Sequence, residues 1–120
     1  MDMNMVIEMD GEIVVLIPAG NFVASVTGSF HTQINRLFGN DCKLLLLDLS
    51  RITFMDSSGL DAVMSTSKRA SDCGGILVCA ALQDNVQKLF RVTWADQKIS
   101  IAATRTAGLQ MIRGLKADQV

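Results

Sequence analysis

Residues 43–60 read KLLLLDLSRITFMDSSGL, a run of leucines followed by a short polar break and a second segment that ends in two adjacent serines. The leucine run, residues 43–49, shows no alternation of apolar and polar residues, which suits a strand buried on both faces of a sheet. Leucine alone would equally permit a helix. The shortness of the run and the polar residues on either side of it favour the strand.

From Ser57 onward the apolar residues take on the spacing of a helix. Residues three and four apart in the chain fall on one helical face: Leu60, Val63, Met64 and Ser67. Two consecutive glycines, Gly74 and Gly75, end this element. The serines of the DSSG stretch therefore stand where a strand and loop give way to a helix.

The rest of the chain reads as further strands and helices. Asp10-Gly11 is a strong signal for a two-residue hairpin turn, and Pro18 is expected to end the second strand of that hairpin. The expected strands are residues 5–9, 12–17, 43–49, 76–80 and 99–102, and the expected helices cover residues 26–37, 57–73, 84–90 and 104–115. A hairpin followed by alternating strands and helices predicts an α/β fold in which the helices pack against a mixed sheet.

Composition narrows the class of protein. With 120 residues, 49% of them hydrophobic, the chain is the size of one domain and can bury a real core. A formal net charge of −1 gives no electrostatic footprint for nucleic acid. No apolar run approaches the roughly 20 residues that cross a bilayer, and the acidic N-terminal stretch is unlike a signal peptide. We therefore expect a soluble, cytoplasmic protein that contacts neither nucleic acid nor membrane.

The cysteines and the single histidine give no support for a metal site or a disulfide. Cys42, Cys73 and Cys79 are odd in number and lack C-x-x-C spacing. Cys79 lies in an apolar run and is expected to be a core residue. His31 has no neighbouring cluster of potential ligands and is expected on an exposed helix face. We expect no bound metal and no cofactor.

The DSSG stretch permits two roles for its serines. In the first role, Ser57 or Ser58 is only the N-cap of a helix, while Asp56 favours the positive helix end. In the second, Ser57 accepts a phosphate, which a helix N-terminus tolerates unusually well. A hydrolytic nucleophile is poorly supported, since the only histidine is in another predicted helix and no G-x-S-x-G elbow is present. Nucleotide-binding glycine motifs are also lacking.

The stretch LLLLDLSRITFMDSSGLDAVMSTSKRASDCGGILVCAAL, residues 44–82, resembles the central part of STAS domains, and NVQKLFRV, residues 85–92, continues the similarity. The resemblance is closest to the single-domain bacterial anti-sigma factor antagonists. It implies that residues 1–120 form a single STAS domain, with an N-terminal hairpin, alternating β/α units and about four helices against a mixed sheet. The element order predicted above agrees with that fold.

The resemblance also implies a function and a set of site residues. In that family a serine kinase, which is also the anti-sigma factor, phosphorylates the serine that follows the Asp of the motif, and a phosphatase restores the unmodified form. Ser57 is the corresponding serine here. Asp56, Ser57, Ser58, Gly59 and Asp61 are the expected partner-binding residues of a non-enzymatic protein that is a monomer or weak dimer.

Three features depart from the family pattern. The stretch Gly20-Asn21-Phe22-Val23 stands where the family commonly has Gly-Glu-Leu-Asp, and Asp61 and Trp94 each replace a residue that is often Gly. The first two changes alter the charge near Ser57. Phe22, Val23 and Trp94 are interpreted as core residues, with an enlarged apolar contact surface as the alternative.

Two other functions remain open on the sequence. The chain could be a STAS module that serves a transport or sensory complex and is never phosphorylated. It could also be an enzyme or a small-molecule-binding domain, for which the residues offer no catalytic constellation.

Overall fold

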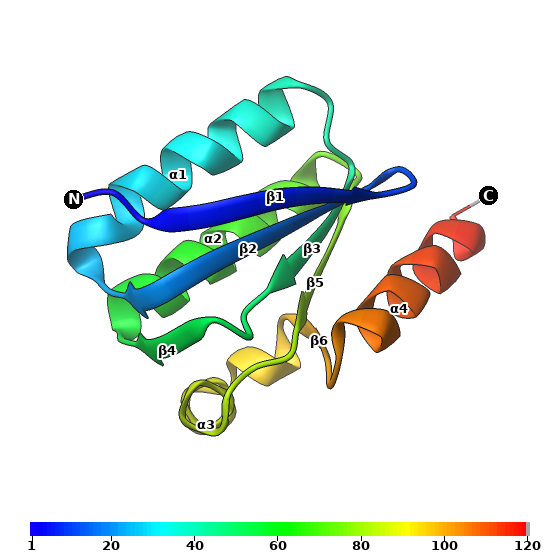
Figure 1. Ribbon diagram of the computed structural model, residues 1–120. Helices are drawn as coiled ribbons and strands as arrows, with labels where there is room; N and C mark the ends of the chain where they lie inside the picture. Colours follow the sequence, from blue (N-terminus) through cyan, green and yellow to red (C-terminus); the bar gives the residue numbers. More distant parts are fainter. Residues whose placement is uncertain (120) are drawn as a thin grey trace.

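A computed structural model describes residues 1–119, which form a mixed α/β structure with a six-stranded sheet (Figure 1). The elements run in the order β1 (Asn4–Asp10), β2 (Ile13–Phe22), α1 (Ala24–Gly39), β3 (Leu44–Asp48), β4 (Ile52–Met55), α2 (Ser57–Asp72), β5 (Ile76–Ala80), α3 (Asp84–Val92), the short 3₁₀ helix η1 (Ala95–Gln97), β6 (Ser100–Ala102) and α4 (Arg105–Asp118). The predicted fold class is confirmed.

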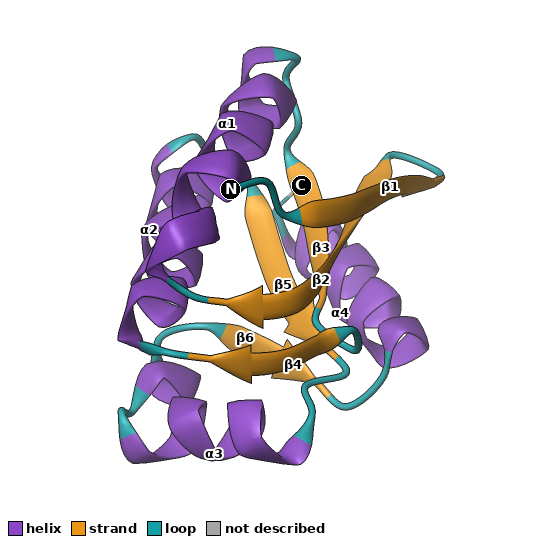
Figure 2. Ribbon diagram, turned by 60° about the vertical axis from the view of Figure 1, so that its left-hand side comes forward, coloured by secondary structure: helices purple, strands orange, loops and turns teal. Residues whose placement is uncertain are grey.

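The leucine run lies at the centre of the sheet, whose main path follows the order β1-β2-β3-β5-β6. β3 pairs in parallel with β2 on one side and with β5 on the other. Figure 2 shows α1 and α2 on one side of the sheet and α4 on the other. Leu45 and Leu47 belong to one apolar cluster, and Leu46 belongs to a second that includes Ile112 of α4. Because helices cover both faces, every position of β3 is buried, and the sequence has no reason to alternate.

The predicted hairpin is present, but its second strand is longer than expected. β1 and β2 pair antiparallel around Gly11, which has a φ of +59°. The prediction that Pro18 ends the second strand is wrong. β2 pairs with β3 only as far as Leu16 and with β4 only from Gly20. Pro18 lies between these two pairings, where its missing N–H breaks no ladder bond toward β3 or β4.

A strand that the sequence did not reveal, β4, leads directly into α2. It pairs in parallel with the end of β2, where Phe22 lies opposite Met55. Only Ile52 and Met55 of its four residues are buried. So short a segment carries too little periodicity to be recognised, and its pairing partner lies some thirty residues earlier in the chain. β4 is the element that brings the DSSG stretch to the end of β2.

α3 supports β4 from the side. Val86 and Phe90 form the buried face of α3. The side-chain amide of Asn85 donates a hydrogen bond to the Thr53 carbonyl oxygen at 2.8 Å, which fixes the start of α3 beside β4.

Candidate functional site

The helix that carries the predicted site is capped by Asp56 and not by a serine. Asp56 has an extended backbone, with φ −102° and ψ −174°, and α2 begins at the next residue. The Asp56 carboxylate accepts a hydrogen bond from the Gly59 N–H at 3.0 Å. The prediction that Ser57 or Ser58 caps the helix is therefore wrong. Asp is as good an N-cap as Ser, and its charge also favours the positive end of the helix.

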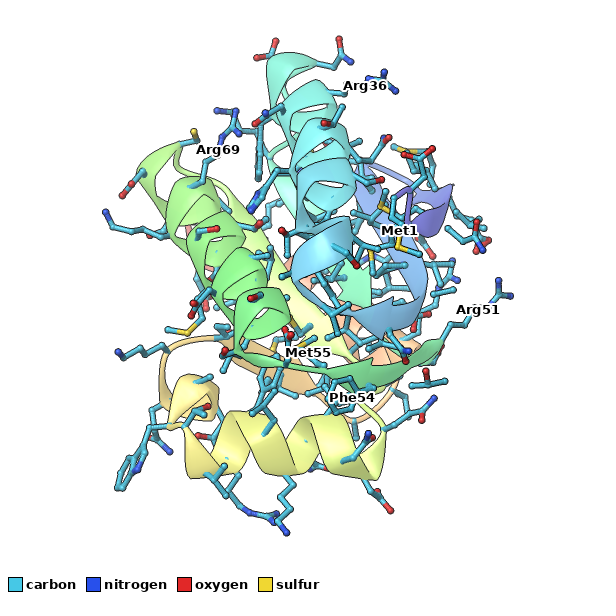
Figure 3. All side chains as sticks on the ribbon, turned by 90° about the vertical axis from the view of Figure 1, so that its left-hand side faces the viewer. Met1, Arg36, Arg51, Phe54, Met55 and Arg69 are labelled. Carbon is cyan, nitrogen blue, oxygen red and sulfur yellow. The ribbon has the colours of Figure 1, made fainter. Side chains whose placement is uncertain are left out.

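Ser57 is the first residue of α2, and its side chain is exposed. Within residues 1–119, no hydrogen bond to the Ser57 hydroxyl is found, and Ser58 is half-buried. Figure 3 labels Met55, which marks the point where the chain leaves β4 and enters α2. Because Asp56 caps the helix, the Ser57 hydroxyl is left free for chemistry at the surface.

Gly59 sets the position of the serines relative to the sheet. An ideal Cβ on Gly59 would lie 2.2 Å from the carbonyl oxygen of Phe22 and 2.9 Å from Cγ of Met55. The Asp56 N–H donates to the same Phe22 oxygen at 3.3 Å. The first turn of α2 thus rests directly on the end of β2, and only glycine permits so close an approach. This close packing against β2 fixes the position of the exposed Ser57.

Side chains from β2, β4 and α3 tie the surroundings of the site together. The Thr53 hydroxyl donates to the side-chain oxygen of Asn21 at 3.0 Å, and Asn85 donates to the Thr53 carbonyl. Nothing in the sequence marks Thr53 or Asn85 as part of the site. Neither residue carries a local signal, because the contacts join positions more than thirty residues apart.

Asp61 lies on the first turns of α2 and is exposed. It is four residues after Ser57, so the two side chains share a helix face. Asp56, by contrast, is half-buried and engaged with the Gly59 N–H. The two carboxylates therefore have different positions: Asp56 caps the first turn of α2, and Asp61 adds negative charge to the surface beside Ser57.

The three apolar residues that depart from the family pattern have different environments. Phe22 is fully buried and packs against Phe30 with ring centroids 4.8 Å apart, as the core interpretation predicts. Val23 is half-buried at the start of α1. Trp94 is 70% exposed, so its interpretation as a core residue is wrong. The sequence could not show this, because the burial of a tryptophan depends on the elements that meet around it.

The single histidine and the three cysteines differ in how far the fold buries them. His31 lies on α1 as expected, but it is half-buried and not exposed, because it meets the Phe30 ring edge-on with ring centroids 5.9 Å apart. Cys79 is buried in β5, and burial raises the pKa of its thiol to about 12. Burial also raises the pKa of Cys42, whereas Cys73 is exposed.

Neither a cluster of metal ligands nor a membrane-spanning helix is present in residues 1–119. Residues 1–119 contain no group of three His, Cys, Asp or Glu side chains placed to hold a metal ion. In the same part of the chain, every helix is too short or too polar to cross a bilayer.

Comparison with known proteins identifies the fold. The family model of the STAS domain matches residues 4–107. A candidate anti-sigma factor antagonist from Thermotoga maritima superimposes with a TM-score of 0.86 and 18% sequence identity, over 91% of this chain and 94% of its own. An anti-sigma factor antagonist from Mycobacterium paratuberculosis gives 0.85 and 18%, over 92% of this chain and 94% of its own.

A third solved structure is similar in fold and is of a modified protein. The Bacillus cell fate determinant SpoIIAA, in its phosphorylated form, superimposes with a TM-score of 0.67 and 19% identity, over 87% of this chain and 96% of its own. At such identities these likenesses show a shared fold.

Proposed function

The chain belongs to the STAS domain family, and we propose that it is an anti-sigma factor antagonist that switches partners according to the phosphorylation of Ser57. The observation that carries the proposal is the free Ser57 hydroxyl, exposed at the first residue of α2 while Asp56 caps the helix. Ser57 is suited to carry a removable phosphate, because within residues 1–119 its side chain makes no contact that the fold needs and its backbone is held against β2 by the packing at Gly59.

The proposed partner is a serine kinase that is also an anti-sigma factor. It binds the surface formed by Asp56, Ser57, Ser58, Gly59 and Asp61, phosphorylates Ser57 and then dissociates, and a serine phosphatase restores the unmodified protein. Two of the similar structures are of anti-sigma factor antagonists or a candidate for that role, and a third is of a phosphorylated protein. These similarities support the proposal.

The proposed switch acts at the interface and leaves the fold unchanged. A phosphate on Ser57 adds about −1.5 to −2 charges at the positive end of α2, where negative charge is favoured. Against a partner surface the same charge must be desolvated and paired, and a mispaired interfacial charge costs about 2–5 kcal/mol. Since 1.4 kcal/mol is tenfold in affinity, partner binding weakens by roughly 30-fold to several thousandfold.

The remaining features of the proposal follow from the same role. The protein works as a binding module and not as an enzyme, in the cytoplasm, without a cofactor. Residues 1–120 act as one domain, as a monomer or weak dimer.

The experiment is capture of partners from the native cell by the tagged protein, followed by intact-mass measurement of the recovered protein. We expect a serine kinase in the captured fraction and a mass increase of one phosphate on a part of the recovered protein. A Ser57→Ala protein, captured in parallel, should bring down the kinase and carry no phosphate. Recovery of a membrane transporter with an unmodified protein would contradict the proposal and favour the unphosphorylated module.

A further inference from the structure

Trp94, directly beyond the C-terminal end of α3, adopts a backbone conformation that does not favour its side chain. Its φ is 64° and its ψ is 14°, which is the left-handed region. The Trp94 N–H donates to the Arg91 carbonyl oxygen at 3.2 Å, so the conformation closes the end of α3. Glycine adopts this region freely, whereas a bulky side chain is strained there. The backbone at this position therefore favours glycine.

Packing within residues 1–119 does not explain why a tryptophan occupies position 94 either, because its side chain is mostly exposed. Trp94 is 70% exposed, and Val92, two residues earlier, is 60% exposed. A single exposed valine is ordinary, but a tryptophan that is both strained and exposed gains nothing for the fold. Tryptophan is the side chain most enriched among the residues that dominate protein–protein binding energy. Both observations indicate a role for Trp94 outside the folded chain.

The exposed surface of α3 carries cations close in sequence to Val92 and Trp94. Val86 and Phe90 face the core, while Lys88, Arg91 and Val92 are exposed and share a face at spacings of three and four residues. Beyond Trp94, the exposed Asp96 and Lys98 balance each other in charge. We define the Trp94 patch as Lys88, Arg91, Val92 and Trp94. It combines two exposed apolar side chains with two exposed cations.

The Trp94 patch lies on the same side of the molecule as the beginning of α2. Figure 3 shows α3 running alongside β4 in the same direction, and the hydrogen bond from Asn85 to Thr53 fixes the beginning of α3. The C-terminal ends of β4 and α3 therefore point the same way. β4 leads directly to Ser57, and α3 leads directly to Trp94.

We propose that the Trp94 patch is a second contact area for the partner kinase, whose surface receives the indole in an apolar pocket rimmed by carboxylates. The inference rests on the proposed function, because it assigns the patch to the partner that Ser57 releases. Cations beside an apolar anchor are complementary to a pocket of that chemistry.

Two other occupants fit the patch less well. An amphipathic helix on a membrane inserts its apolar face, but the apolar face of α3 is buried in the core. A symmetric contact between two copies would bring two Trp94 patches, each with two cations, into one interface, where like charges oppose association.

The experiment uses the kinase captured by the wild-type protein and then purified. Trp94 is the only tryptophan in the chain, so biosynthetic labelling with fluorotryptophan gives a fluorine NMR signal from Trp94 alone. We expect this signal to shift when the kinase is added. Trp94→Gly should weaken kinase binding at least about 30-fold, as truncation of a dominant anchor does. The thermal midpoint of Trp94→Gly should stay the same or rise, because the strain is relieved.

Matched variants separate the possible outcomes. Met9→Ala removes an apolar side chain of β1 that is 61% exposed, and it should leave kinase binding unchanged. Arg91→Glu should weaken binding, with a larger effect at low salt. Unchanged binding of Trp94→Gly, with Ser57 still phosphorylated, would overturn the Trp94 patch and leave the proposed function standing. A captured partner that needs Trp94 but never phosphorylates Ser57 would overturn the proposed function and its link to the patch.

The other occupants are tested with their own probes. Trp94-dependent binding to vesicles of anionic phospholipid, with no change in the fluorine signal on adding the kinase, would overturn the proposal in favour of a membrane. Trp94-dependent self-association in sedimentation, again without a kinase-induced change, would overturn it in favour of a second copy.

Discussion

At the beginning of α2, the residue that caps the helix and the residue proposed to accept the phosphate are neighbours with separate tasks. Asp56 satisfies the Gly59 N–H, and Ser57 is exposed. Loss of an N-cap costs about 0.5–2 kcal/mol, whereas a surface substitution away from such features stays within about 0.5 kcal/mol. The structure therefore lets the two roles be separated by mutation.

Ser57→Ala is expected to abolish phosphorylation by the partner kinase and to change the free energy of unfolding by less than about 0.5 kcal/mol. Ser58→Ala should leave the main acceptor in place. Asp56→Ala, as the control for the cap, should lose about 0.5–2 kcal/mol of stability in a denaturant titration. Phosphopeptide mapping that placed the phosphate on Ser58, or on neither serine, would show that Ser57 is not the acceptor.

Ser57→Asp tests whether charge at this position acts on the interface or on the fold. A carboxylate at the first residue of α2 meets the positive helix end, so the thermal midpoint should move little. Partner affinity, measured by calorimetric titration, should fall, though by less than for a phosphate because Asp carries less charge. Wild-type affinity would count against the interface mechanism. A large drop in the thermal midpoint would indicate that the charge acts through the fold.

The contact between α2 and the end of β2 is decided by one glycine. Gly59→Ala would place a methyl group 2.2 Å from the Phe22 carbonyl oxygen, a backbone atom that cannot rotate away. Overpacking of this kind costs about 1–3 kcal/mol. We expect that loss in the free energy of unfolding, together with weaker partner binding, since α2 must shift and carry Ser57 with it.

Gly114→Ala in α4 is the matched control. No atom lies within 4 Å of a Cβ built at Gly114, and this exposed position is inside a helix. There the change from glycine to alanine should stabilise the protein by about 0.5–1 kcal/mol. If both variants gained stability by similar amounts, the close approach of α2 to β2 at Gly59 would be wrong.

At the scale of the whole molecule, the cysteines differ in how deeply the fold buries them. Cys79 is fully buried in β5, an interior strand of the sheet, Cys42 is half-buried, and Cys73 is exposed where α2 ends. Thiol-modifying reagents should label Cys73 first and reach Cys79 only when the protein unfolds. We also expect all three thiols to be reduced and to have no part in partner binding.

Burial of Cys79 makes stability depend on pH in the alkaline range. The pKa of Cys79 is raised from its ordinary value of 9.0 to about 12 by burial. Above about pH 9 the unfolded chain releases this proton while the folded chain keeps it, so the contribution to stability is complete below that pH and is lost as pH rises toward about 12. Denaturant titrations should show the stability gap between the wild type and Cys79→Ala narrowing above pH 9. A constant gap would contradict this.

The sequence by itself determined the central sheet and most of the helices. Four consecutive leucines between polar residues indicated a strand buried on both faces, and Asp10-Gly11 indicated the hairpin. The apolar spacing after Ser57 indicated α2. These signals are local: each depends on the periodicity or turn chemistry of a few adjacent residues, so it can be read without knowing what lies opposite.

Only the tertiary structure decided the rest, because the deciding contacts join distant parts of the chain. β4 exists through its pairing with the end of β2, and Gly59 is required because the Phe22 carbonyl lies against it. The choice of Asp56 as the cap depends on where the backbone leaves β4 and becomes helical. Trp94 is exposed because the end of α3 turns it away from the core through a left-handed backbone. No pattern of neighbouring residues encodes such long-range geometry.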